Sequence, residues 1–320
     1  MASTLEGCTP RRIFTCALGL ALITLAEANA DGPGARGRPG RSCSTTTAYA
    51  NHGCRFEALA EYNVSLGKCE NLSEFEDRSA CRREARAALR EEIESCREQF
   101  EARRELCAEL GQDLYDPPIH PDDFVGEVTN RFFPLPPGQK RIYEGDTEEG
   151  VERVEVEVLS EKREILGVSC TVVKDQVFLE DELIEDTLDF FAQDKDGNVW
   201  YFGEQTFELE DGVIVSLEGA WTAGEDGAKP GIVMKANPQV GDVYRQEFLL
   251  GEAEDAARVV ALDQKVSVPA GNFDGCLETE DFTPLEPDNV EHKFYAPGVG
   301  TVLEVNVETG ERVELVDIEG

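Results

Sequence analysis

Six cysteines in the first third of the chain are spaced as a palindrome, and this spacing constrains the fold more than any other feature. The steps between them are 11, 15, 12, 15 and 11 residues. In an α-helix each residue turns by about 100°, so either longer step returns to nearly the same face. Two antiparallel helices in mirror register would then turn their cysteines toward each other. The spacing predicts a nested ladder of three disulfides, Cys43–Cys107, Cys54–Cys96 and Cys69–Cys81.

The segment that carries these cysteines has the composition of a helical hairpin. Residues 43–112 are rich in Ala, Glu, Arg and Leu and contain no proline, which favours helix. We place the turn near Glu70–Ser73. Two helices bury little apolar surface, whereas each disulfide can contribute about 2–4 kcal/mol. Zinc is disfavoured because no CxxC pair or close Cys/His set is present. We therefore assign residues 43–115 to a disulfide-linked hairpin.

The N-terminus has the pattern of a signal peptide. Arg11 and Arg12 precede an apolar stretch, Ile13–Leu25, and Ala28-Asn29-Ala30 matches a cleavage site. Residues 1–30 are predicted to be removed and residues 31–42, rich in Gly, Pro and Arg, to form a linker. No second stretch is long enough to span a membrane. The pattern predicts an exported protein, periplasmic or extracellular, a setting that permits disulfides.

Residues 116–320 are predicted to form a large antiparallel β domain. Asp116-Pro117-Pro118 ends the helical segment. Beyond it, runs such as Arg153–Val158 alternate charged residues with valine, as half-buried strands do. Turns containing Gly with Asp, Asn or Thr separate about eleven such runs. The predicted fold class is α+β, with the hairpin followed by a curved antiparallel sheet or barrel.

Two further cysteines, Cys170 and Cys276, lie within predicted strands of this domain. An even number of cysteines in an exported chain favours pairing, so we expect a fourth disulfide between them. The alternative is two buried free thiols.

The chain has a formal net charge of −36. Such a surface repels nucleic acid and anionic lipid headgroups, so neither is a predicted partner. The charge fits either cation binding or a solvated acidic coat. Because the acidic residues spread over the whole β region, the coat is the simpler interpretation.

Candidate ligand-binding residues cluster around the aromatic-rich segment 185–234. Glu185 and Asp189 are four residues apart on one predicted strand and therefore point to one face. The alternating pattern would also bury several other polar side chains, and such burial is costly unless they are paired or bind a ligand. Structural ion pairs are the alternative, with Lys293 as a further pairing candidate. The predicted set is Glu185, Asp189, Glu204, Trp221, Arg245, Glu247 and His292.

No cofactor is predicted, with calcium kept as the one ion considered. Asp194-Lys195-Asp196-Gly197-Asn198 resembles the start of a calcium loop. However, an EF-hand needs Gly at the sixth position and Glu at the twelfth, and this chain has Val199 and Gln205 there. The segment is better explained as a hairpin turn.

Catalytic motifs give little support for an enzyme, and no catalytic residue is assigned. The chain has no GxSxG, P-loop, dinucleotide-binding or HExxH motif, and it contains three histidines. Paired carboxylates could still serve a glycosidase.

Several longer strings resemble a family of exported bacterial β-rich proteins with no assigned activity. They are EDTLDFFAQD and GNVWYFGE near residue 190, YRQE at Tyr244, TPLEP at Thr283 and EHKFYAPGVG ending at Gly300. The resemblance covers roughly residues 116–315 and implies a shared β fold. The last string also resembles concave-sheet proteins such as lipoprotein-carrier-like folds, an analogy of fold alone.

These observations predict an exported binding or envelope protein without enzymatic activity. It would hold a small ligand or divalent cation in a concave β-sheet, or bind an envelope partner. Two alternatives stay open: a carboxylate-dependent glycan hydrolase, and a structural or interaction module that uses the hairpin as a docking arm.

Overall fold

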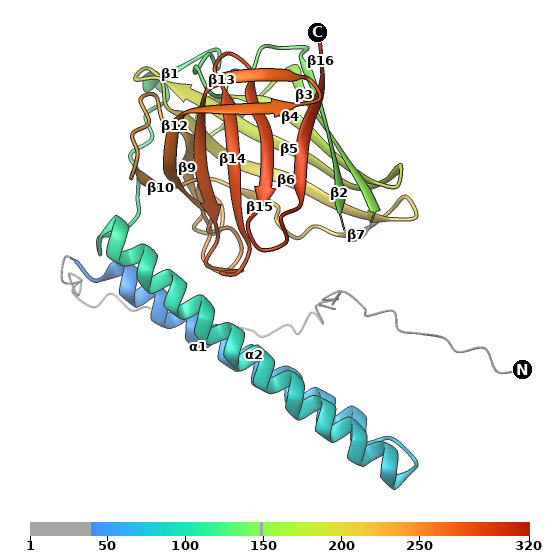
Figure 1. Ribbon diagram of the computed structural model, residues 1–320. Coiled ribbons are helices and arrows are strands. Elements are labelled where there is room, and N and C mark those ends of the chain that lie inside the picture. The colour runs from blue at the N-terminus through green and yellow to red at the C-terminus, as the bar shows by residue number, and fades with distance from the viewer. Residues whose placement is uncertain (1–39, 148–149) are drawn as a thin grey trace, which may run out of the picture. The chain divides into compact units, whose positions relative to one another are not determined.

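The computed structural model describes residues 40–147 and 150–320 (Figure 1). The predicted signal peptide and residues 31–39 of the predicted linker lie outside the described residues.

The helical hairpin consists of α1, Ser42–Glu70, and α2, Phe75–Leu110. All three predicted disulfides are confirmed, with Cα–Cα distances of 5.7, 5.8 and 5.5 Å. The turn lies at residues 71–74, one residue later than predicted, and the Arg78 guanidinium holds it by donating to the carbonyls of Leu72 and Ser73. Between the helices the buried apolar residues are few, chiefly Ala58, Ala85 and Leu106. The cysteine ladder therefore takes the place of a hydrophobic core.

The rest of the described chain is a curved antiparallel sheet, which confirms the predicted fold class. Alternating polar and apolar residues form long strands, and Gly or Asp at positive φ closes the turns, as at Asp211-Gly212. A short 3₁₀ helix, Pro121–Asp123, precedes the sheet. The strands are β1 Phe124–Val125, β2 Lys140–Thr147, β3 Gly150–Ile165, β4 Val168–Leu179, β5 Glu182–Asp194, β6 Val199–Glu210, β7 Val213–Ser216, β8 Trp221–Thr222, β9 Lys229–Met234, β10 Val243–Arg245, β11 Glu247–Phe248, β12 Ala256–Val268, β13 Gly271–Phe282, β14 Val290–Ala296, β15 Gly300–Asn306 and β16 Arg312–Glu319.

The strand order brings the two edges of the sheet together. The order is β10-β12-β13-β14-β15-β16-β2-β3-β4-β5-β6-β9-β11, with β1 paired to β5 and with β7 and β8 paired to β6. The edge strands β10 and β11 are separated in sequence by Gln246 alone, so the sheet curves into a nearly closed barrel (Figure 1). Inside, an apolar cluster that includes Phe191, Met234 and Leu277 fills part of the space.

Cys170 and Cys276 are free thiols, so the predicted fourth disulfide is wrong and the alternative is confirmed. Cys170 lies on β4, among Phe190 and Phe202. Cys276 lies on β13, in a separate apolar cluster, and β14, β15, β16, β2 and β3 intervene in the strand order. Burial raises the pKa of the Cys170 thiol to about 12.

A buried ion pair joins α2 to the turn before β12. The guanidinium of Arg103 donates to both carboxylate oxygens of Glu254, from Nη2 to Oε1 at 2.7 Å and from Nε to Oε2 at 2.9 Å. The two side chains are 5% and 2% exposed, and the backbone N–H of Gly251 also donates to Glu254. A bidentate geometry with an extra donor is what makes a buried pair tolerable.

Candidate functional site

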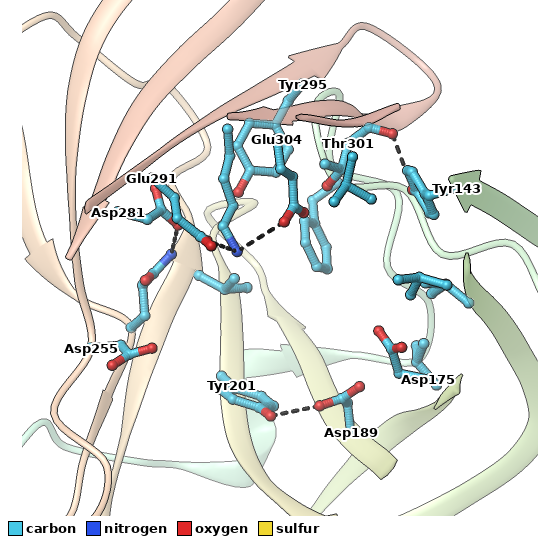
Figure 2. Close-up of a pocket in the computed structure, with 18 of the residues that line it drawn as sticks. Tyr143, Asp175, Asp189, Tyr201, Asp255, Asp281, Glu291, Tyr295, Thr301 and Glu304 are labelled. Atoms are coloured by element: carbon cyan, nitrogen blue, oxygen red, sulfur yellow. Dashed lines mark hydrogen bonds and ion pairs between the residues drawn. The ribbon is translucent and has the colours of Figure 1, made fainter. Parts of the chain in front are cut away.

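A polar cavity of about 510 Å³ occupies the part of the barrel that the apolar cluster leaves open (Figure 2). Nine carboxylates line it, but among the described residues only two cationic side chains do, Lys293 and Arg141. Aromatic rings form much of the remaining wall. The carboxylates are Glu152, Asp175, Glu185, Asp189, Glu247, Asp255, Asp281, Glu291 and Glu304, and the aromatic residues are Phe133, Tyr143, Phe191, Tyr201, Phe282 and Tyr295.

Both cations are already engaged. The Nζ of Lys293 lies 3.4 Å from Glu291 Oε2 and 3.6 Å from Glu304 Oε2 (Figure 2). The negative charge of Glu304 raises the pKa of Lys293 well above its ordinary value, and Glu291 adds to the rise. Burial acts in the opposite direction but is outweighed. Arg141 donates to the carbonyl of Pro134 and to Gln139. The lining carboxylates therefore outnumber the lining cations by nine to two.

Asp189 lines the cavity from β5. Its Oδ1 accepts a hydrogen bond of 2.6 Å from the Tyr201 hydroxyl (Figure 2). Burial raises the pKa of Asp189 to about 7, although the Tyr201 bond acts in the opposite direction. Glu204 is its partner across the β5–β6 ladder. Burial and then the charge of Asp189 raise the pKa of Glu204 to about 8.

Asp175 faces the same space from β4. Burial, followed by the charges of Asp189 and Glu185, raises its pKa well above the ordinary value. Its Oδ1 is buried without a hydrogen-bond partner among the described residues. A buried carboxylate oxygen in this state is costly, so a donor supplied by a ligand would stabilise it.

Glu247 is the most enclosed carboxylate of the cavity wall, at 7% exposed. No cation pairs with it among the described side chains. Burial and then Asp255 and Glu204 raise its pKa well above the ordinary value. Trp221 packs edge-on against Tyr201 at 5.4 Å, which gives this corner of the cavity an aromatic wall.

The structure brings together five of the seven residues predicted from the sequence. Glu185, Asp189 and Glu247 line the cavity. Glu204 and Trp221 do not line it but adjoin residues that do, Glu204 as the cross-strand partner of Asp189 and Trp221 in ring contact with Tyr201.

The other two predicted residues face away from the cavity. Arg245 stacks over Phe248 at 4.6 Å and Tyr115 at 5.6 Å. His292 Nδ1 lies 2.7 Å from Glu278 Oε1. Since Lys293 points into the cavity, its neighbour His292 must point to the opposite face of β14.

Sequence reasoning missed several lining residues, Asp175, Asp281 and Glu304 among them. One signal was available for Asp175, since Val173, Asp175 and Val177 alternate along β4 and all line the cavity. A carboxylate in phase with two valines, of which Val173 is buried and Val177 half-buried, is placed on the inner face. The inward orientation of Asp281 and Glu304 could not be predicted in this way, because it depends on which strands pair with β13 and β15.

No metal-binding arrangement is present in the described residues, where no group of three or more His, Cys, Asp or Glu side chains could hold an ion. In the turn that resembles a calcium loop, the Asp194 carboxylate accepts from the Asn198 backbone, the Asn198 amide and the Trp200 indole, each at 2.8 Å. These bonds close the hairpin turn. Nor does any described helix have the length and apolar character needed to cross a membrane.

Comparison with known proteins gives one structural likeness. No protein-family model and no curated protein matches the chain. A solved structure of a candidate lipoprotein from Parabacteroides distasonis is similar at 12% sequence identity, with a TM-score of 0.34, covering 59% of this chain and 99% of the other.

Proposed function

We propose that this protein is an exported, non-enzymatic binding protein that holds a small organic cation in the barrel cavity. The observation that carries the proposal is the mismatch of charge in the cavity wall. Nine carboxylates line it against two cations that are already engaged, and Glu247 is buried without a cationic partner. The three disulfides fit export.

A cationic ligand would offset the repulsion among the carboxylates of the cavity wall. Burial and mutual repulsion keep protons on carboxyls such as Asp189, whose pKa is raised to about 7. A bound cation lets these groups ionise, so binding releases protons. Affinity is therefore expected to rise with pH as Asp189 loses its proton near pH 7.

An organic cation fits the wall better than a bare metal ion. Calcium requires six to eight oxygens at roughly 2.3–2.6 Å around one point, and no group of acidic or histidine side chains in the described residues provides such a centre. The carboxylates are instead spread among aromatic faces such as Phe191 and Tyr201, which attract an ammonium group.

The test measures melting temperatures with a small set of probes: butane-1,4-diamine, choline, calcium chloride and a neutral glucose oligosaccharide. The amines are expected to raise the melting temperature, more at pH 8 than at pH 6. Glu247→Gln and Asp189→Asn should weaken that response. Glu278→Gln is the matched control, because Glu278 pairs with His292 outside the cavity and its loss should leave the response intact.

Each other outcome identifies a different function. Stabilisation by calcium alone would support the divalent-cation alternative. Cleavage of the oligosaccharide, lost in Asp189→Asn, would support the hydrolase. If no amine shifts the melting temperature at either pH, the cation proposal is wrong.

A further inference from the structure

The helix α1 has a second organised face, opposite the cysteine face. Six residues recur on it at steps of 4, 3, 4, 3 and 4, and every one is exposed. Tyr49 and Phe56 are each 71% exposed. The steps average 3.6 residues, the period of the α-helix, so the six residues share one face of α1. The six residues, called here the outer stripe, are Tyr49, Gly53, Phe56, Ala60, Asn63 and Gly67.

The outer stripe carries no charge, in contrast to the rest of the hairpin. Five of the 29 residues of α1 are charged, against 18 of the 36 residues of α2. In a chain of net charge −36, an uncharged face with exposed aromatic side chains leaves apolar surface in contact with water, which is unfavourable. Exposed apolar surface of this kind marks an interaction site.

Large and small residues alternate strictly along the outer stripe. Tyr49, Phe56 and Asn63 are large, and each is followed by Gly53, Ala60 or Gly67. A Cβ added at Gly53 or Gly67 would meet nothing within 4 Å, so each glycine leaves a notch on the helix surface. Glycine is unfavourable inside a helix, and two of them in phase with exposed aromatics indicate that the notches receive side chains.

We propose that the outer stripe binds the outer stripe of a second copy of this chain, with the two helices antiparallel. When the pair is centred at the level of Ala58, Phe56 of one copy lies opposite Ala60 of the other. In the same register Tyr49 lies opposite Gly67, and Asn63 opposite Gly53. Every large residue then faces a small one, and the two-fold symmetry of a homodimer repeats each contact.

A parallel pair is disfavoured for two reasons. It would set Phe56 against Phe56 and leave the notches facing each other. It would also place both acidic barrels at one end, because the barrel follows the end of the hairpin closed by Cys43–Cys107. In the antiparallel pair these ends are about 45 Å apart at 1.5 Å per residue, well beyond the screening distance of about 8 Å.

The expected contact is small but sufficient for a weak dimer. The two aromatic side chains, with Leu59 at 43% and Val64 at 59% exposed beside them, and the small residues would bury about 450 Å² per copy. The total of about 900 Å² lies near the lower limit for specific association. We expect a dissociation constant on the order of 10 µM.

Sedimentation equilibrium of the oxidised protein tests the dimer. Wild type should show a reversible monomer–dimer equilibrium, and Phe56→Glu should weaken it by at least tenfold. Phe75→Glu is the matched control, since Phe75 is 73% exposed at the start of α2, off the stripe, and this variant should dimerise like wild type. A monomer at all concentrations, or equal effects of the two variants, overturns the proposal.

The orientation is tested by the distance between two spin labels, one on each copy, carried by a non-natural amino acid in place of the exposed Thr45. The antiparallel pair predicts a separation of about 40 Å along the helix axis. A separation near 15 Å would mean a parallel pair and would overturn the proposed arrangement.

Discussion

Replacing Asp189 by Asn should flatten the pH dependence of stability of the ligand-free protein. The pKa of Asp189 rises from 3.8 to about 7 because the carboxyl is buried. Between these values the unfolded chain has lost the proton while the folded chain keeps it, so stability falls as the pH rises through this window. Linkage gives a loss of about 2.6 kcal/mol between pH 5 and pH 8 from this one group.

The measured contribution should be smaller, about 1–2.5 kcal/mol, because the cavity admits water to the side chain. Asn keeps an oxygen that can accept from the Tyr201 hydroxyl and has no proton to lose. We expect Asp189→Asn to exceed the stability of wild type at both pH values, and by a larger margin at pH 8 than at pH 5.

Urea unfolding followed by tryptophan fluorescence at both pH values provides the measurement, since Trp221 is buried beside Tyr201. Asp211→Asn, in the exposed turn between β6 and β7, is the control and should keep the wild-type pH dependence. If Asp189→Asn keeps it too, Asp189 is hydrated and the account of the acidic wall is refuted.

Three further predictions concern the hairpin and the thiols. Arg103→Ala should cost about 3–5 kcal/mol in urea unfolding because it leaves the buried Glu254 carboxylate without its cation. Arg97→Ala, on the exposed face of α2, should leave the unfolding free energy nearly unchanged, and equal costs would contradict the buried geometry. Dithiothreitol should abolish the helical circular-dichroism signal at 222 nm while near-ultraviolet bands of the barrel persist, because the hairpin has little core besides its disulfides; a helical signal that survives reduction would show otherwise. A thiol reagent should find two thiols in the unfolded protein lacking residues 1–30 and none in the folded one, since Cys170 and Cys276 are buried; a count of zero after unfolding would mean that they pair.

The hairpin could be predicted from the sequence because its information is local and periodic. The helical repeat fixes which residues share a face, so the cysteine steps alone selected the pairing that the structure contains. The antiparallel class of the β domain followed in the same way from alternation along strands such as β3.

The cavity could be predicted only in part, because alternation gives two faces and does not say which face is inside. Glu185 and Asp189 were assigned to one face, and they share the cavity. His292 was expected beside them, although the inward residue is its neighbour Lys293. Closure also depends on pairings between distant segments, such as β2 with β16, which no local pattern reveals. The same lack of long-range information explains the wrong expectation for Cys170 and Cys276.

The outermost cross-link of the ladder has a mechanical consequence. Tension applied between the chain before Cys43 and the barrel after α2 passes through the Cys43–Cys107 bond and bypasses residues 44–106. This part of the two helices bears no load, so a pull on the N-terminal end cannot stretch the hairpin open. Single-molecule stretching should show the extension of the arm only after a reductant is added. The hairpin thus lies outside the covalent path that carries the tension. A partner attached at its far end is therefore shielded from force along the chain.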